Sequence, residues 1–204
     1  MLGPVSLLFN NAGVAARVPP EKLTYQLWDW CNGINLGGVI NGIQTFLPRM
    51  IERGLGGHIV NTSSGAALAG SMAGTLYSTA KFAVLGMSET LNLELAPLGI
   101  GVSALCPGPT ATGFIQRSAG AIAQLGTALS AEEEKMEADT HEFLQTGASP
   151  EEVGAMVLEA VKNNCLFIVT DRIFEEPVRL RTEAILNALP ERASNPDLFF
   201  KKSN

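Results

Sequence analysis

A tyrosine and a lysine lie four residues apart in this sequence, at Tyr77 and Lys81. If the segment is helical, this spacing puts both side chains on one face, one turn apart. A free phenol has a pKa of about 10, and a neighbouring ammonium favours the phenolate and lowers that pKa. Such a tyrosine could exchange a proton with a substrate oxygen. The pair alone is weak support for catalysis, because most such pairs on helices are surface neighbours.

Three other segments carry groups that could bind a ligand. Asn10-Asn11-Ala12-Gly13 follows an apolar run; its asparagines could tie adjacent strand ends together, and Gly13 allows close backbone approach. Ser64 follows a second apolar run, where its hydroxyl could hydrogen-bond a developing alkoxide. Pro107-Gly108-Pro109-Thr110 follows a third run, with Thr112 behind it. Taken singly, each segment is weak or moderate support for a site, since each can also be an ordinary turn, and Ser64 alone is better explained as a polar loop serine.

Short apolar runs alternate with helical patterns along the chain. The expected strands are Val5 to Phe9, His58 to Asn61, Gly101 to Cys106 and Leu166 to Thr170. The expected helices are Leu23 to Arg53 (one helix, or two joined near Asn35), Leu76 to Pro97, a helix from an N-cap at Ser149 to about Lys162, and Arg172 to Leu189. This alternation predicts βαβ units and a parallel sheet, an α/β fold in one domain over residues 1–204.

The remaining segments are less regular. Thr110 to Thr146 is of mixed character and contains the acidic run Glu132 to Asp139, which we interpret as a solvated helix face. Pro190 to Asn204 reads as a polar tail. In this arrangement all the candidate groups fall at the carboxyl ends of strands or on the helix just behind one. That is the ligand-binding edge of a doubly wound sheet.

Composition excludes several classes of function. The net charge of −6 and pI near 5.0 argue against a nucleic-acid partner, which would require a basic patch. Cys31, Cys106 and Cys165 are scattered and odd in number, which fits reduced thiols and a cytoplasmic location. Neither His58 nor His141 has a Cys or His partner at metal-ligand spacing, so no metal site is expected.

A membrane segment is also not expected. The uncharged run Trp30 to Pro48 contains three asparagines, a glutamine and four glycines, whose polar groups would be costly in hydrocarbon. It reads as a buried helix. Met1 to Phe9 has no basic region and no cleavage site, so it is not typical of a signal peptide.

Together these residues resemble the short-chain dehydrogenase/reductase family. The resemblance is carried, in family order, by Asn10-Asn11-Ala12-Gly13, Asn35, Ser64, Tyr77-x-x-x-Lys81 and Pro107-Gly108. Ser64 lies thirteen residues before Tyr77, the usual spacing in that family. The likeness is specific from about Val5 to Thr112 and looser through Val169.

The resemblance implies a function and a set of roles. The implied reaction is hydride transfer between NAD or NADP and a small alcohol or ketone, on a Rossmann-like fold. Tyr77 would be the general acid/base, Lys81 would lower its pKa and bind the nicotinamide ribose, Ser64 would polarise the substrate carbonyl, and Asn35 would hold a water linked to Lys81. The residues implied to line the cofactor are Asn10, Ala12, Gly13, Tyr77, Lys81, Pro107, Gly108, Thr110 and Thr112.

The chain departs from the family at its start. The strand expected at Val5 to Phe9 matches the family's fourth, so three strand–helix units, roughly 80 residues, with the phosphate-binding turn and the NAD/NADP-selecting residue are missing. We expect this strand to be an exposed apolar edge, with poor NAD(P) binding and marginal solubility as consequences. Alternatives are an inactive remnant with an oligomerisation or binding role, and an unrelated α/β binding module.

The resemblance also implies a homo-oligomer, a dimer or tetramer paired through the helices of Leu23 to Arg53 and Leu76 to Pro97. The segment Thr110 to Thr146 would form a lid facing the substrate. Its apolar residues favour an apolar or aromatic alcohol, or else simply close the core: Phe114, Ile115, Ile122, Leu125 and Leu129.

Overall fold

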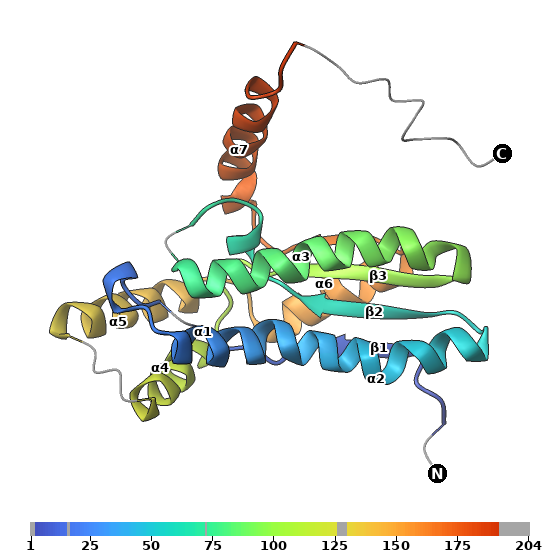
Figure 1. Ribbon diagram of the computed structural model, residues 1–204, viewed down its shortest axis with the longest axis horizontal. Coiled ribbons are helices and arrows are strands. Elements are labelled where there is room, and N and C mark those ends of the chain that lie inside the picture. Colours follow the sequence, from blue (N-terminus) through green and yellow to red (C-terminus); the bar gives the residue numbers. More distant parts are fainter. Residues whose placement is uncertain (1–2, 16, 72, 126–129, 192–204) are drawn as a thin grey trace.

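The computed structural model describes residues 3–15, 17–71, 73–125 and 130–191, and within them four parallel strands form one sheet (Figure 1). The order in the sheet follows the chain, β1-β2-β3-β4. Their bounds are Leu7–Asn10 for β1, Gly57–Thr62 for β2, Ile100–Cys106 for β3 and Phe167–Val169 for β4. The predicted parallel α/β sheet is confirmed, with strand ends within three residues of the predicted ones.

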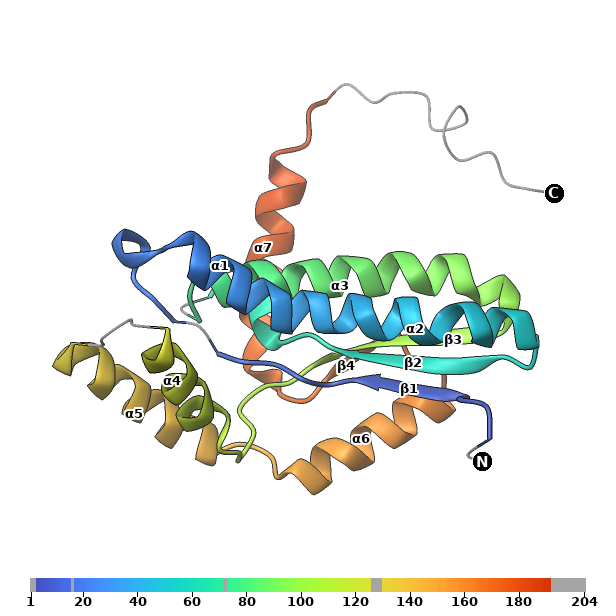
Figure 2. The ribbon, with the colours of Figure 1, turned by 60° about the horizontal axis from the view of Figure 1, so that its bottom comes forward.

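Helices cover both faces of this sheet (Figure 2). On one face lie α1 (Tyr25–Asn32), α2 (Gly38–Arg53) and α3 (Thr75–Leu95); on the other lies α6 (Pro150–Lys162). Alternate residues of β2 pack against the helices on opposite faces of the sheet, because successive strand side chains point to opposite faces. Ile59 packs with Met50 and Leu95, whereas Val60 packs with Val153 and Val157 of α6.

The first predicted helix is a single rod with an irregular centre. Thr24 begins it, accepting a hydrogen bond from the backbone N–H of Leu27, and Gly54 ends it with a φ of 64°. Between α1 and α2 the backbone widens into a π turn, η2 (Gly33–Gly37), with Asn35 buried in the middle. The predicted joint near Asn35 is therefore a wider turn rather than a break.

The mixed region after β3 contains two helices, α4 (Phe114–Gln124) and α5 (Ala131–Gln145). Ser130 and Glu133 form a capping box that starts α5, and none of the residues of this helix is buried. The prediction of a solvated acidic helix face is confirmed. Leu129, and the predicted tail from residue 192, lie outside the described residues.

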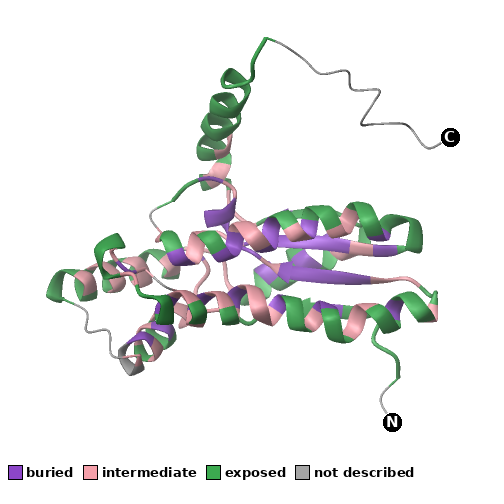
Figure 3. Ribbon diagram, viewed as in Figure 1, coloured by how far each residue is buried: buried purple, intermediate pink, exposed green. Residues whose placement is uncertain are grey.

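The last two helices, α6 and α7, differ in how they are packed. A capping box of Ser149 and Glu152, with Pro150 at the first helical position, starts α6 as predicted. After the 3-10 turn η5 (Arg172–Phe174), α7 (Glu175–Asn187) projects from the body with no buried residue (Figures 1 and 3). Three further 3-10 turns are η1 (Pro20–Lys22), η3 (Gly65–Ala67) and η4 (Ala96–Leu98).

Among the described residues, β1 pairs only with β2. Leu8 is buried against the α2–α3 layer, whereas Leu7 and Phe9, on the opposite face, are 50% and 54% exposed. The expected apolar edge is therefore present. Within the described ranges, no helix combines the length and apolar character needed to cross a bilayer.

Candidate active site

The carboxyl ends of β1 and β2 are tied together by side chains. Asn10 Nδ2 donates to Asn61 Oδ1 at 2.8 Å, and Thr62 Oγ1 donates to Asn11 Oδ1 at 2.9 Å. Asn61 extends this hydrogen-bond network by donating from Nδ2 to Ser88 Oγ of α3 at 3.0 Å. The predicted link between strand ends is confirmed, and it reaches the helix layer as well.

The Asn10 side chain also packs against α2. A Cβ added at Gly42 would overlap the Asn10 carboxamide, so the two elements approach closely at this point. With its amide bonded to Asn61 and its oxygen against α2, Asn10 holds strand and helix together. Ala12, by contrast, is exposed.

Asn35 fixes the segment that follows β1. Its Oδ1 accepts a hydrogen bond from Val14 N at 3.1 Å, and its Nδ2 donates to Val14 O at 3.0 Å. The same Nδ2 contacts Cys31 Sγ at 3.3 Å. A Cβ added at Gly13 would lie 2.9 Å from Asn35 Oδ1 and 3.4 Å from Lys81 Nζ. The backbone at Gly13 therefore runs directly against two of the predicted catalytic side chains.

Lys81 is buried on α3, and its ammonium is held in place. Its Nζ donates to Thr62 O at 2.9 Å and lies 5.6 Å from the centroid of the Tyr77 ring. Burial lowers the pKa of Lys81 to about 8. At neutral pH the side chain is therefore still mainly charged, close to the point where it loses its proton.

Tyr77 lies beside Ser64, with a pKa shifted opposite to the expected direction. Burial raises the pKa of Tyr77 to about 12, while a hydrogen bond with the Ser64 side chain acts to lower it. The sequence spacing predicts a lowered value from Lys81. In the structure Lys81 lies over the ring and is bonded to Thr62 O, and desolvation is the largest influence on the pKa of the phenol. Ser64 Oγ also accepts from Ala66 N at 3.1 Å, which starts η3.

The loop after β3 completes this edge of the sheet. Pro107 O accepts from Gly65 N at 3.0 Å, which places it next to the Ser64 segment. Gly108 N donates to Thr170 Oγ1 at 2.9 Å, and Thr110 Oγ1 donates to Gly108 O at 3.1 Å. Thr112 is tied elsewhere, its carbonyl accepting from Gln145 of α5 at 3.0 Å. The predicted residues thus gather at one edge, with Thr112 on its lid side.

Two residues of the predicted lid lie close to the other site residues: Phe114, one of its apolar residues named from the sequence, and Ser118, which the sequence did not single out. The Phe114 ring centroid lies 6.1 Å from that of Tyr77, tilted by 59°, within the usual range for aromatic pairs. Ser118 Oγ accepts from Ala15 N at 2.8 Å. Ile122 is buried and Leu125 packs against the α1 core, so these two close the core. The contact between Ala15 and Ser118 spans 103 positions and leaves no local pattern that would reveal it.

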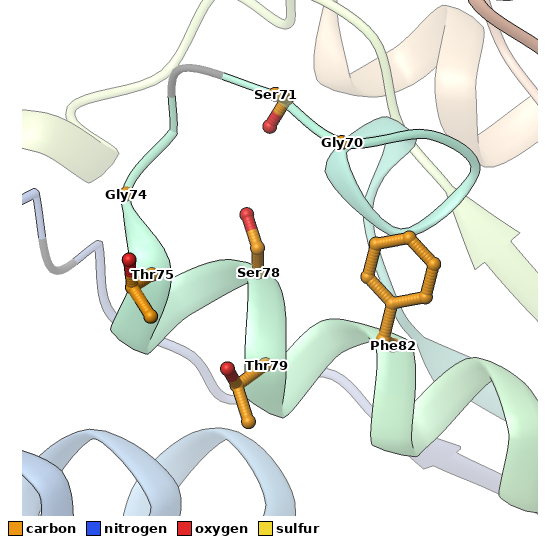
Figure 4. A pocket seen from close by; sticks show the side chains of 7 residues that line it. All are labelled: Gly70, Ser71, Gly74, Thr75, Ser78, Thr79 and Phe82. Carbon is orange, nitrogen blue, oxygen red and sulfur yellow. The ribbon is translucent and has the colours of Figure 1, made fainter. Parts of the chain in front are cut away.

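A hollow on another face of α3 is separate from this site (Figure 4). It is lined by Gly70, Ser71, Gly74, Thr75, Ser78, Thr79 and Phe82. Ser78 follows Tyr77 directly, and neighbours on an α-helix point about 100° apart. None of the predicted catalytic residues lines this hollow. Across the described residues, no group of three or more His, Cys, Asp or Glu side chains could hold a metal ion.

Comparison with known proteins shows which family the chain belongs to. The family model described as "short chain dehydrogenase" matches residues 1–123. The C alpha-dehydrogenase of Sphingobium sp. (strain NBRC 103272 / SYK-6) is 36% identical over 192 residues, which are 94% of this chain and 63% of that protein. The chain therefore spans less than two thirds of this curated relative.

Solved structures agree in fold. A short chain dehydrogenase/reductase from Burkholderia phymatum, solved in complex with NAD, matches with a TM-score of 0.83 at 30% identity, over 94% of this chain and 70% of that one. The apo form of LigO from Sphingobium sp. strain SYK-6 matches with a TM-score of 0.72 at 36% identity, over 96% and 63%. The chain belongs to the short-chain dehydrogenase family, a family of oxidoreductases.

Proposed function

We propose that this chain carries the catalytic residues of an oxidoreductase that interconverts a small alcohol and its carbonyl compound with NAD or NADP. One observation carries the proposal. Tyr77 lies near the carboxyl edge of the sheet, with Ser64 close enough to influence its pKa and the Lys81 ammonium 5.6 Å from the centroid of its ring. This grouping supplies a proton donor, a second hydroxyl and a cation around one point.

The residues present fit the nicotinamide end of such a cofactor. Gly13 has no side chain, and a Cβ there would lie 2.9 Å from Asn35 Oδ1, so glycine lets the backbone run close to Asn35 and Lys81 beside the proposed ribose position. Lys81 provides the charged donor for ribose hydroxyls, and Gly108 and Thr110 provide the loop beside it. Asn10 supports this arrangement indirectly, through Asn61. The nicotinamide, when bound, supplies or accepts the hydride.

The residues of this chain handle the proton. In reduction, Tyr77 Oη gives its proton to the substrate oxygen as the carbonyl carbon gains the hydride, and the O–H bond of the phenol breaks. The raised pKa keeps Tyr77 protonated at neutral pH, which suits this direction. Ser64 donates a hydrogen bond to the same oxygen, and Lys81 stabilises the tyrosinate that remains. Asn35 orders the adjoining segment and the water that returns a proton.

The finer parts of the proposal concern substrate and assembly. The Phe114 ring beside Tyr77 supports an apolar or aromatic alcohol or ketone. Exposed apolar side chains on the long helices, including Ile40, Ile51 and Leu93, support a homo-oligomer paired through α2 and α3.

A second candidate is a non-catalytic chain with an oligomerisation or binding role. It is favoured by the uncovered face of β1, where Leu7 and Phe9 are about half exposed. In such a chain the side chains at the site would be retained without turnover.

Titration and turnover distinguish the two candidates. The chain is titrated calorimetrically with NADH and NADPH and then screened against alcohols and ketones. Tyr77→Phe is expected to lower kcat/KM by about 100-fold or more, since it removes the proton donor. The matched control is Tyr25→Phe, because Tyr25 is the other tyrosine and is 90% exposed. Absence of both binding and turnover supports the non-catalytic chain; equal activity in Tyr77→Phe overturns the assigned role.

A further inference from the structure

Ser118 of α4 is buried, and its hydroxyl is bonded on both sides. Its Oγ accepts the backbone N–H of Ala15 at 2.8 Å and donates to the carbonyl of Phe114 at 2.8 Å. The residue is only 3% exposed. The first bond joins α4 to the segment after β1 across 103 positions in the chain, and the second lies within α4. We propose that Ser118 is a positioning residue that clamps the lid onto the segment after β1.

The segment that Ser118 grips is itself fixed to the predicted catalytic centre. Val14, next to Ala15, exchanges two hydrogen bonds with the buried Asn35 side chain, at 3.1 and 3.0 Å. Residues 13–15 are thus held on one side by the long helix and on the other by the lid. Hydrogen bonds from Asn35 to Val14 and from Ala15 to Ser118, with the peptide bond between Val14 and Ala15, thus connect Asn35 to Ser118.

The clamp sets the position of one side chain at the site. Ser118 bonds the carbonyl of Phe114, the first residue of α4, whose ring lies 6.1 Å from the Tyr77 ring. If α4 moves away from Ala15, the Phe114 ring moves with it. Ser118 therefore fixes one wall of the space next to the Tyr77 phenol. This inference rests on the proposed function of Tyr77.

A second tie between the residues after β1 and the predicted lid joins different elements, η1 and α5, and is exposed. Lys22 Nζ of η1 pairs with Glu133 of α5 at 2.7 Å, with the lysine side chain 39% exposed. Ion pairs exposed to water contribute little to stability, because solvent screens their attraction and both side chains lose conformational freedom. Ser118 is the buried one of the two ties, and it is closer in sequence to Phe114.

Amide hydrogen exchange tests the clamp without any need for turnover. Ser118→Ala should speed exchange of the Ala15 amide by about 10-fold or more, because that N–H loses its acceptor. The matched control is Thr140→Ala in α5, where the lost hydroxyl bonds only the Met136 carbonyl one turn back. Its Ala15 exchange should stay within about twofold of the parent. Unchanged Ala15 exchange in a folded Ser118→Ala variant overturns the proposal.

The effect on the site is read from tyrosine NMR. The chain has two tyrosines, so Tyr77 can be followed with Tyr25 as an internal reference. Phe114→Leu removes the ring current on Tyr77, and Ser118→Ala should shift the Tyr77 ring signals toward those of Phe114→Leu. Ser118→Thr, which keeps the hydroxyl, should restore them. Tyr77 signals identical in Ser118→Ala and the parent would show that Ser118 does not position Phe114.

Kinetics then separate the two proposals. In an active protein, Ser118→Ala should raise KM for the carbonyl substrate by about 10-fold and leave kcat within about threefold, since Ser118 touches no reacting atom. A larger fall in kcat than rise in KM overturns the positioning role. If the parent has no turnover, the proposed function fails, while the exchange and NMR results still decide whether Ser118 clamps the lid.

Discussion

The Lys81 ammonium faces the ring of Tyr77, at 5.6 Å from its centroid, and donates its hydrogen bond to the carbonyl of Thr62. Both side chains are largely removed from water, and burial moves their pKa values apart, to about 8 for Lys81 and about 12 for Tyr77. Over most of the neutral range both therefore carry their protons. With both groups protonated, Tyr77 can act as a proton donor beside the Lys81 cation.

We expect carbonyl reduction to fall as pH rises through about 8. Burial lowers the pKa of Lys81 to about 8, so the cation that stabilises the tyrosinate is lost above that value. The measurement is kcat/KM for reduction from about pH 6 to pH 10 at constant ionic strength. The Lys81→Arg variant keeps its charge and should show a weaker decline. A parent profile that is flat to about pH 10 would contradict this assignment.

Replacing Lys81 with methionine should abolish turnover yet stabilise the fold at neutral pH. Holding a buried cation whose pKa falls from 10.5 to about 8 costs on the order of 3 kcal/mol, offset in part by its bond to Thr62 O. Urea unfolding at pH 7 measures the difference.

The pH dependence of that difference is a stricter test. Between about pH 8 and pH 10.5 the unfolded chain binds the Lys81 proton and the folded chain has lost it, so stability rises with pH in the parent relative to Lys81→Met. The shift at Tyr77 is common to both proteins. A gap between parent and variant that does not narrow over this range would count against a desolvated lysine.

Asn10→Ala should destabilise the fold by about 1–3 kcal/mol, because it leaves the buried Asn61 Oδ1 without its partner. The matched control is Asn11→Ala. Asn11 is exposed, and its bond with Thr62 is open to water, so the loss there should be below about 0.5 kcal/mol. Chemical denaturation measures both. Equal effects from the two variants would mean that the bond between Asn10 and Asn61 does not stabilise the sheet.

Gly13→Ala should weaken binding of NADH or NADPH by about 10-fold. The added methyl group would lie 2.9 Å from Asn35 Oδ1, which must then shift, and in contact with Lys81 Nζ at 3.4 Å, beside the expected ribose. Gly38→Ala is the control, since a Cβ at that helical position meets nothing within 4 Å. Calorimetric titration of both variants checks this, and unaltered affinity in Gly13→Ala would place the cofactor elsewhere.

The elements with strong local patterns were predictable from the sequence. Apolar runs bounded by asparagine, glycine and proline gave all four strands of the sheet, and the Ser149 cap with Pro150 and Glu152 gave the start of α6. The positions of Asn10, Ser64 and Tyr77 at one edge also followed, because the carboxyl ends of parallel strands meet there.

Properties set by long-range contacts were not predictable. The pair Tyr77 and Lys81 predicts a lowered pKa for the phenol, but the extent of burial around it reverses the direction. Ser118 contacts Ala15 only once the lid has folded back onto the chain, and spacing does not encode that contact. The acidic run indicated α5, whereas α4 was not predicted, because the segment around it is of mixed composition.

The π turn at η2 helps keep the buried residues of α1 and α2 pointing in the same direction. From Leu27 to Ile43 the buried residues of the long rod repeat every four positions: Leu27, Cys31, Asn35, Val39 and Ile43. In a regular α-helix each such step drifts about 40°, so the first and last would point about 160° apart. The wider turn takes up part of this drift, and α1, η2 and α3 stay in contact. Removing one residue from η2 would rotate Leu27 and Cys31 away from α3, so the exact residue count there matters more than the identity of most of its side chains.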